Sequence, residues 1–488
     1  MKIRIFLFSI FLITVSIYAG SLDSVQVGPG VTQYHQIIDS GPWNINIIKI
    51  DIQNPWLKFQ SVKAGDKLMA FEKTSSMAAR NNFEEHKVVA AINGDFYNTS
   101  TGEQIGSQVA NGQLLKATND WLNIAFDIDK NPIIGMQNFS GLIIRDDSIK
   151  SISGVNKIRN VDEMIFYNSF YGSSTSTNQY GTEVRIIPID SWLVNDTIRC
   201  IVDTVVTGIG NMVIGNNKAV LSGHGISGVF LVNNLFKDDT IKVVLNLTPA
   251  LSKIEQLIGG NTWLVQNGNV NQDNGDRHPR TSVGFNQDST QFFMFVVDGR
   301  QPGLSVGMSY KELGDYMKIW GVHNGLNLDG GGSSTMVVRG SIVNSPSDIG
   351  GERSVANSLL LISTAPTGPL EYIRIHPKEV FVLGGSSVNL FASGFDQYYN
   401  PVNIASGSLV WSCDPSIGII TQNGVFTASF DTVSGYIFAT VGEIKDSALV
   451  HLAKISQIIL EPNPVILQPG QSQQMTATAY DNYNNQIL

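Results

Sequence analysis

One carboxylate followed by three glycines and three hydroxyl residues is the segment of this chain best suited to chemistry. The run Asp329-Gly330-Gly331-Gly332-Ser333-Ser334-Thr335 follows the short apolar segment Gly325-Leu326-Asn327-Leu328. Successive glycines are costly to order, because each loses more backbone entropy on folding than any other residue. Their amides can converge on an anion, while Asp329 supplies a charge or a base. The run therefore indicates a binding site, although a plain connection between two elements is the alternative.

Polar or charged residues stand beside turn residues in four more places in the same half of the chain. These are Gly259-Gly260-Asn261, His278-Pro279-Arg280-Thr281, Asp298-Gly299-Arg300 and Gly351-Glu352-Arg353. Loops at strand ends are where a rigid scaffold presents binding groups. We therefore expect these loops to share one site with the glycine run.

Five sequence blocks in this region resemble the phosphodiester glycosidase family. They read INGDFYN, HPRTSVGF, VVDGRQPG, NLDGGGSSTMV and VNSPSDIGGERSVANSLL, at 92–98, 278–285, 296–303, 327–337 and 343–360. They occur in the family's order and cover approximately residues 63–363. The resemblance implies hydrolysis of the bond between a sugar and the phosphate of a glycosyl phosphodiester, of the N-acetylglucosamine-1-phosphodiester type or a related surface glycan. Such a reaction needs a carboxylate near the anomeric carbon and donors around the phosphate.

Three aspartates are candidates for the catalytic carboxylate. Asp329 is the first choice, because its block is the family's most distinctive, and a turn-capping aspartate is the alternative. Asp95 is the second, with a residue of an Asn-Gly hairpin turn as its alternative. Asp298, the third, could instead form a local ion pair with the nearby Arg300.

Substrate contacts are expected from residues whose side chains or amides suit phosphate and sugar. Arginine forks match phosphate oxygens bidentately, histidine titrates near neutral pH, and an asparagine can bind a sugar hydroxyl through either amide end. The candidates are Asn93, His278, Arg280, Arg300, Gly330, Gly331, Gly332, Ser333, Ser334 and Arg353.

No metal site is assigned and no cofactor is expected. The three aspartates could still hold a divalent cation through oxygen ligands. The stretch Asn271 to Asp276 imitates a calcium loop but lacks the closing glutamate, so we interpret it as an exposed turn.

The first 20 residues are typical of a signal peptide. Lys2 and Arg4 precede an apolar stretch too short for an ordinary membrane span, and small residues follow it, with a retained anchor as the alternative. We therefore expect an exported protein, at the cell surface, in a periplasm or outside the cell, without a membrane span in its mature form. Without those two cations the formal charge of −9 becomes −11, and no basic run would neutralise a nucleic-acid backbone. Cys200 and Cys413 fall in different expected domains and are interpreted as separate thiols.

Several domains are expected from 488 residues. Residues 21–62 alternate apolar and polar residues in a β pattern. In residues 63–363 strands and helices interleave. A buried strand is predicted at 87–92, delivering Asn93 at its end, and helices are predicted at 71–83 and 309–320, the second with a capping box formed by Ser309 and Glu312. The predicted fold of this catalytic region is α+β, with sheets flanked by helices. The segment 364–369 has the composition of a linker. Two sequence copies offset by 85 positions follow (Ile373 and Ile458, Gly385 and Gly470), and they predict an all-β Ig-like sandwich at 370–453 with a truncated second copy at 455–488.

The sequence thus predicts an exported phosphodiester glycosidase acting on a glycosyl phosphodiester or surface polysaccharide. The rival hypothesis is a secreted carbohydrate-binding or adhesive protein that has lost turnover. Nucleotide binding is excluded, because the glycine run lacks the lysine of a phosphate-binding loop.

Overall fold

The computed structural model describes residues 20–248, 252–431, 433–484 and 486–487. Residues 1–19 of the expected signal peptide lie outside the described residues. The chain divides into two compact units, Met1–Thr364 and Ala365–Leu488. Every candidate site residue belongs to the first unit.

The fold is mostly β, so the α+β prediction is wrong. About half of the chain is strand and 7% is helix, and the described residues contain three α-helices, α1 (Thr74–Arg80), α2 (Ile226–Asn234) and α3 (Tyr310–Ile319). Nearly all strand pairs are antiparallel, and antiparallel neighbours can be joined by turns where parallel ones need long crossovers. The predicted helix at 71–83 shrinks to α1, because Glu72–Lys73 form strand β5 instead. None of the described helices is long and apolar enough to cross a membrane.

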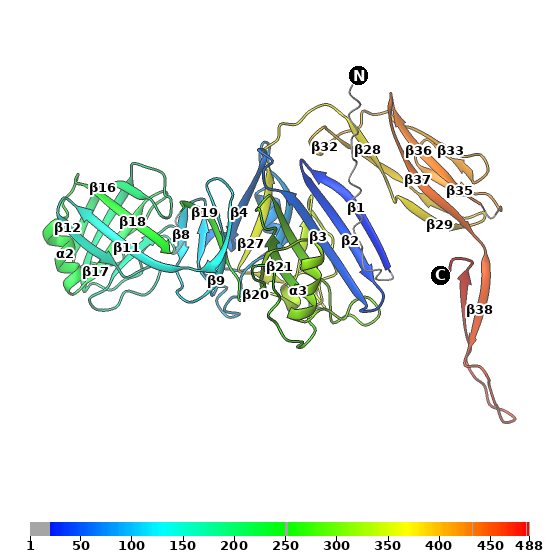
Figure 1. The fold of residues 1–488 in the computed structure, drawn as a ribbon, viewed down its shortest axis with the longest axis horizontal. Coiled ribbons are helices and arrows are strands. Elements are labelled where there is room, and N and C mark those ends of the chain that lie inside the picture. The colour runs from blue at the N-terminus through cyan, green and yellow to red at the C-terminus, as the bar shows by residue number, and fades with distance from the viewer. Residues whose placement is uncertain (1–19, 249–251, 432, 485, 488) are drawn as a thin grey trace, which may run out of the picture. The chain divides into compact units, whose positions relative to one another are not determined.

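Four main sheets and one small two-stranded sheet build the first unit (Figure 1). The seven-stranded sheet runs β1 (Gly20–Gly28), β2 (Val31–Ile38), β3 (Trp43–Asp51), β22 (Gln291–Val297), β21 (Arg280–Phe285), β23 (Asn324–Asn327) and β20 (Thr262–Val265). One five-stranded sheet runs β25 (Ser341–Ile342), β24 (Met336–Val338), β6 (Lys87–Asn93), β27 (Asn357–Ser363) and β4 (Leu57–Lys63). The small sheet pairs β26 (Ser354–Val355) with β5.

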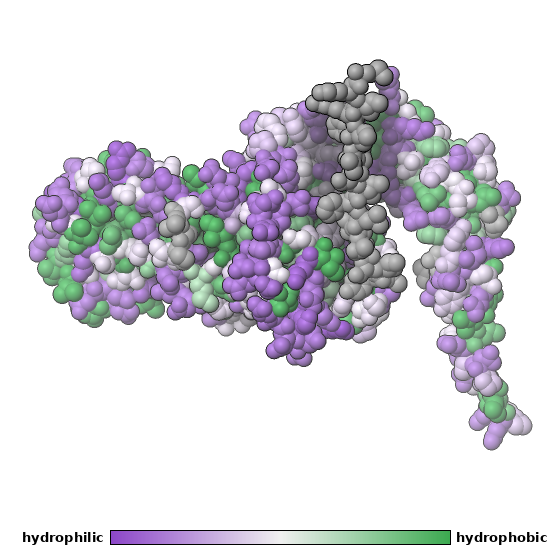
Figure 2. Space-filling view, viewed as in Figure 1, coloured by the Kyte–Doolittle hydropathy of each residue, from purple (hydrophilic) through white to green (hydrophobic). Residues whose placement is uncertain are grey.

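The other two sheets come from the middle of the sequence. One runs β10 (Pro132–Met136), β9 (Leu122–Asp127), β19 (Ile254–Gly259), β7 (Gln108–Ala110) and β8 (Gln113–Lys116). The other runs β12 (Ser148–Ile152), β11 (Asn138–Arg145), β18 (Thr240–Thr248), β16 (Thr197–Thr207), β15 (Gly181–Pro188), β17 (Ala219–His224), β14 (Met164–Asn168) and β13 (Gly154–Val155). Helix α2 packs on this last sheet through Leu231 but leaves Ile226 and Val229 exposed. Figure 2 shows apolar patches on the surface of this part of the first unit.

A shared core fixes the two sheets that carry the site residues. Ile48 and Val283 of the seven-stranded sheet pack with Ile92 and Leu359 of the first five-stranded sheet in one buried cluster. On the opposite face of the seven-stranded sheet, a second cluster is built around α3. The capping box predicted at Ser309 is confirmed, since its hydroxyl accepts from the Glu312 amide. This packing holds the strand ends rigidly.

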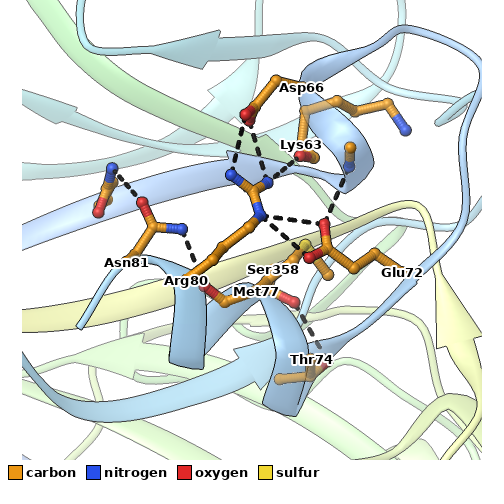
Figure 3. Close-up of polar contacts among 10 residues, drawn as sticks. Lys63, Asp66, Glu72, Thr74, Met77, Arg80, Asn81 and Ser358 are labelled. Carbon is orange, nitrogen blue, oxygen red and sulfur yellow. Dashed lines mark hydrogen bonds and ion pairs between the residues drawn. The ribbon is translucent and has the colours of Figure 1, made fainter.

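Helix α1 packs against β6, and Arg80 in its last turn links it to neighbouring segments (Figure 3). The Arg80 guanidinium donates to Asp66 at 2.9 and 3.0 Å, to Glu72 at 3.0 Å and to the carbonyl of Lys63 at 2.8 Å. Met77 and Ala78 of the same helix are buried against the sheet. The helix therefore supports the strand that ends at Asn93.

The second unit is all β and has its own core. Its sheets comprise β28 (Tyr372–His376), β31 (Phe391–Phe395) and β32 (Pro401–Val402); β29 (Glu379–Leu383), β37 (Ile444–Ala453), β36 (Ser434–Val441) and β33 (Val410–Cys413); and β30 (Ser387–Asn389), β35 (Val425–Ala428) and β34 (Gly418–Ile420). Trp411, Phe426 and Ile437 are buried between them. Strands β38 (Ile455–Glu461), β39 (Thr476–Asp481) and β40 (Gln486–Ile487) form a further small sheet, and β38 is exposed along its whole length.

Candidate active site

Asn93 joins the two sheets at the point where their functional strands end. It is fully buried at the end of β6, and its amide donates to the backbone carbonyl of Asp329 at 2.6 Å. Its side-chain oxygen accepts from the Thr281 hydroxyl at 2.7 Å and from the Thr335 amide at 3.1 Å. In addition, the Asp329 amide donates to the carbonyl of Gly94 at 2.9 Å. Both amide ends of Asn93 are thus engaged by protein, which makes it a positioning residue.

Asp95 lies in a tight pocket of glycines directly beyond β6. The Gly106 amide donates to its carboxyl at 2.6 Å, and the Trp121 indole nitrogen lies 3.4 Å from it. A Cβ atom at Gly259 would come within 2.4 Å of the same carboxyl, so only glycine fits there. Asp95 is 1% exposed, and burial raises its pKa to about 7, with a smaller contribution from the charge of Asp329.

Asp329 is the more accessible of the two carboxylates. It follows β23 and is partly exposed, whereas the residues before it are buried. Burial among protein groups raises its pKa to about 6, although the Ser333 hydroxyl, the Gly330 amide and the charge of Arg353 favour the ionised form. A carboxyl with these properties can change its protonation state close to neutral pH and still reach a ligand.

Asp298 organises the surrounding loops. The carboxylate accepts from the Asn44 amide at 2.7 Å, the Asn344 amide at 2.9 Å and the Ser345 backbone amide at 2.9 Å. It is 1% exposed, and burial raises its pKa while these donors lower it. Its oxygens are occupied by one donor from strand β3 and two from the loop after β25, so Asp298 is placed to hold that loop against the seven-stranded sheet.

The glycine run passes between two arginines. A Cβ at Gly331, whose φ is +63°, would lie 3.3 Å from the guanidinium nitrogens of Arg300. A Cβ at Gly332 would lie 2.1 Å from Asp348 and 2.2 Å from Arg353. Arg353 is paired with Asp348 at 2.7 Å and keeps 40% of its side chain exposed. The absence of side chains in the run therefore lets two cations approach its backbone.

His278 lies in the loop before β21, and Arg280 is the first residue of that strand. The Arg280 guanidinium lies over the Tyr310 ring at 4.1 Å and donates to the carbonyls of Met308 and Asp276. His278 lies 3.4 Å from a guanidinium nitrogen of Arg300. Burial and the neighbouring arginine charges lower the pKa of His278, which favours its neutral form.

The hydroxyls after the glycines are turned into the protein. Ser333 and Ser334 are 0% and 1% exposed, and Thr335 is equally buried. Within the described residues the hydroxyls of Ser334 and Thr335 have no hydrogen-bond partner. They remain available to a water or ligand atom at the inner side of the loop.

The predicted site residues fall into two groups. The first group is brought together: Asn93, Asp95 and Asp329 lie at the strand ends, and the glycine run connects them with Arg300, Arg353 and His278. Arg280 and Asp298 border the site, but each is enclosed by protein partners. Within the described residues, no cluster of three or more acidic, histidine or cysteine side chains could hold a metal ion.

Some residues that shape the site were absent from the sequence prediction. Trp121 and Gly106 hold Asp95, and Asp348 orients Arg353. Lys63 is 1% exposed and donates to the carbonyls of Gly102 and Ala356 at 2.8 and 2.7 Å, and burial lowers its pKa to about 7. These partners are remote in sequence or are ordinary residue types, and the only local signal was the Gly259-Gly260 pair.

Comparison with known proteins finds a family model that matches part of this unit. A family model described as phosphodiester glycosidase matches residues 194–362. The match contains the glycine run and all three candidate arginines, whereas Asn93 and Asp95 precede it.

Two curated relatives carry the name N-acetylglucosamine-1-phosphodiester alpha-N-acetylglucosaminidase. The Mus musculus protein is 31% identical over 112 residues, which cover 19% of this chain and 21% of the relative. The Bos taurus protein is 30% identical over 168 residues, 29% of this chain and 30% of the relative. The matched part thus spans about a fifth to a third of the length of these relatives.

A crystal structure of a hypothetical protein from Synechocystis shares the fold. The TM-score is 0.53 at 16% identity, over 71% of this chain and 64% of that chain. This likeness concerns the arrangement of strands alone.

Proposed function

Since residues 194–362 match the phosphodiester glycosidase family, we propose that this protein is an exported hydrolase that cleaves the sugar–phosphate bond of a glycosyl phosphodiester. The observation that carries the proposal is Asp329, a partly exposed carboxyl with a pKa of about 6 at the start of a glycine run flanked by Arg300 and Arg353. The proposed substrate is of the N-acetylglucosamine-1-phosphodiester type. Export is proposed from the apolar, cation-led pattern of residues 1–20.

The proposed reaction breaks the bond between the anomeric carbon and the phosphate oxygen. Positive charge develops on the sugar ring, and the departing phosphomonoester takes the bonding electrons. Ionised Asp329 stabilises the ring or activates the attacking water, whose oxygen forms the new bond to carbon. Arg300 and Arg353 stabilise negative charge on the departing phosphate. Because phosphate is a good leaving group, little acid assistance is needed.

Asp95 serves a supporting role in this proposal. It is buried, and its carboxyl is held by Gly106 and Trp121 behind the strand end. Its neutral form persists to about pH 7, because burial disfavours a second negative charge beside Asp329. The two aspartates therefore differ in exposure and in the pH at which they ionise, which suits different roles.

A panel of glycosyl phosphodiesters tests this function when free reducing sugar and phosphomonoester are both measured. We expect both products in equal amounts, and we expect Asp329→Asn to lower turnover by about 10²–10⁴-fold while the fold is kept. Asp315→Asn, an exposed change on α3, is the matched control. Sugar without phosphomonoester, or an active Asp329→Asn variant, would contradict the proposal.

A further inference from the structure

A cleft of about 300 Å³ opens beside β20, in the first unit. Its lining combines Leu122 and Trp263 with polar, uncharged side chains, and none of the lining residues is ionisable; the polar ones are Asn261, Thr262, Gln266, Asn269, Asn271 and Gln272. Figure 2 shows mainly hydrophilic surface around β20 and α3. The volume lies at the lower end of the range for small-molecule sites, about 300–1,000 Å³, so it suits one small ligand unit.

Several polar groups in this cleft are not used by the protein. Gln266 and Asn271 are exposed, and neither side chain has a hydrogen-bond partner among the described residues. The Trp263 ring is partly exposed. Amides both donate and accept, as sugar hydroxyls do, and a tryptophan offers an apolar face with a donor at its edge. This combination fits an uncharged saccharide better than an anion.

Two hydrogen bonds connect the lining of the cleft with residues that lie close in the chain to Asp329 and Trp121. The Asn327 side chain donates to the side-chain oxygen of Asn261 at 2.8 Å, and the Gly260 amide donates to the carbonyl of Leu122, next to Trp121. From Asn327 the chain continues through Asp329 to Gly331, beside the guanidinium of Arg300. Along the chain, Asp329 thus lies between Asn327, which contacts the uncharged cleft through Asn261, and Gly331, which lies beside the cationic Arg300.

We propose that this cleft is the sugar-binding subsite of the enzyme and that it accepts an uncharged saccharide unit while the arginines bind the phosphate. This inference rests on the proposed function and adds an orientation to it. The cleft should disfavour a sugar that carries a carboxylate, because the carboxylate would lose its hydration against neutral amides. A positive charge introduced into the cleft should reduce this discrimination, because it would offer the carboxylate a partner.

Two matched substrates test the subsite. One is the methyl phosphodiester of N-acetylglucosamine 1-phosphate, and the other carries a carboxylate at C6 of the sugar. We expect the wild-type protein to prefer the neutral substrate by at least about 10-fold in kcat/KM, and Gln266→Ala or Asn271→Ala to lower kcat/KM for it about 3–10-fold, mainly through KM. Gln266→Arg should reduce the ratio of kcat/KM between the neutral and the carboxylated substrate, because the guanidinium can pair with the carboxylate. Gln33→Ala, on the distant strand β2, is the control. Equal rates on both substrates, or unaffected Gln266 and Asn271 variants, would overturn the subsite.

Binding of free N-acetylglucosamine, followed by saturation-transfer NMR, separates this inference from the proposed function. If neither diester is hydrolysed, the proposed function fails. The subsite then stands only if the wild-type protein binds the sugar and the Gln266→Ala and Asn271→Ala variants do not. No sugar signal with the wild-type protein would overturn it.

Discussion

The side-chain amide of Asn93 donates a 2.6 Å hydrogen bond to the backbone carbonyl of Asp329. Through this bond the end of β6 fixes the position of the most accessible carboxylate of the site. The same side chain accepts from Thr281 and Thr335, so one buried asparagine aligns three segments.

Replacing Asn93 by alanine should therefore damage both stability and turnover. The change leaves buried partners unsatisfied, and we expect the first unit to lose about 2–4 kcal/mol of unfolding free energy. Misplacing Asp329 should cost about 10²-fold in turnover of the folded fraction. Denaturant unfolding and steady-state kinetics measure the two effects. Asn138→Ala, at an exposed position of β11, should change neither the unfolding free energy nor turnover. If Asn93→Ala also changed neither, Asn93 would not align the site.

The pH profile should report the raised pKa of Asp329. The pKa lies at about 6, above the usual value for aspartate, because burial disfavours the ionised form. A base must be ionised, so turnover should rise as pH increases through about 6 and level off above it. Because Asp95 has a pKa of about 7 and is coupled to Asp329, the rise belongs to the pair of carboxyls.

Removing the charge of Arg353 should shift this pH profile in a known direction. The charge of Arg353 lowers the pKa of Asp329, so Arg353→Gln should move the rising limb to higher pH. The measurement is kcat/KM from pH 4 to 9 for both proteins. A limb near pH 4, or a limb that does not move in the variant, would show that Asp329 is not the titrating base.

Glycine at position 332 should be indispensable for a steric reason. Its φ is not in the left-handed region, yet an added Cβ would lie 2.1 Å from Asp348 and 2.2 Å from Arg353. Gly332→Ala should break their ion pair or displace the loop, with at least about a 10²-fold loss of turnover. At Gly350 an added Cβ meets nothing within 4 Å, so Gly350→Ala should keep activity. Equal activity of the two variants would mean that the Arg353 position does not matter.

Local sequence patterns predicted the parts of the site that depend on neighbours in the chain. The buried strand ending at Asn93 and the capping box of Ser309 are found as expected. The fold class was wrong, because the helical tendency of residues 71–83 could not show that Glu72–Lys73 pair with β26. Nor could local reasoning find the structural role of Asp298, whose three donors come from segments distant in sequence.

The second unit should be dispensable for turnover on a soluble substrate. We propose that residues 364–369 are a linker, that 370–453 form an Ig-like spacer domain and that 455–488 repeat part of its sequence. Each unit has its own hydrophobic core, so a protein ending at Pro369 should fold and keep turnover within about two-fold. A protein ending at Arg353 lacks β27 and should not fold, which provides the control. A folded protein ending at Pro369 with little activity would reject the spacer role.

The two arginines of the HPRT and DGR loops should differ in function. Arg280 is enclosed by the Tyr310 ring and two carbonyls. Arg300 has a φ of +60°, a left-handed conformation that costs energy for a side chain of this kind, and its guanidinium faces Gly331. Strain of that kind persists where the surrounding structure imposes it and is often found at functional sites. We therefore predict that Arg300 contacts the substrate phosphate and that Arg280 supports the fold.

Arg300→Gln should lower kcat/KM on the phosphodiester by roughly 30- to 1,000-fold, by analogy with the loss of one oxyanion donor. The rate on a matched neutral aryl glycoside should change little, because that substrate lacks the phosphate charge. Arg300→Lys should recover only part of the loss, since the bidentate fork is gone. Arg280→Gln should instead reduce both rates together and lower the unfolding midpoint, because a stacked and hydrogen-bonded cation is removed from its partners. Equal losses on both substrates for Arg300→Gln would show that Arg300 also supports the fold, and the phosphate contact would then have to be assigned to Arg353 alone.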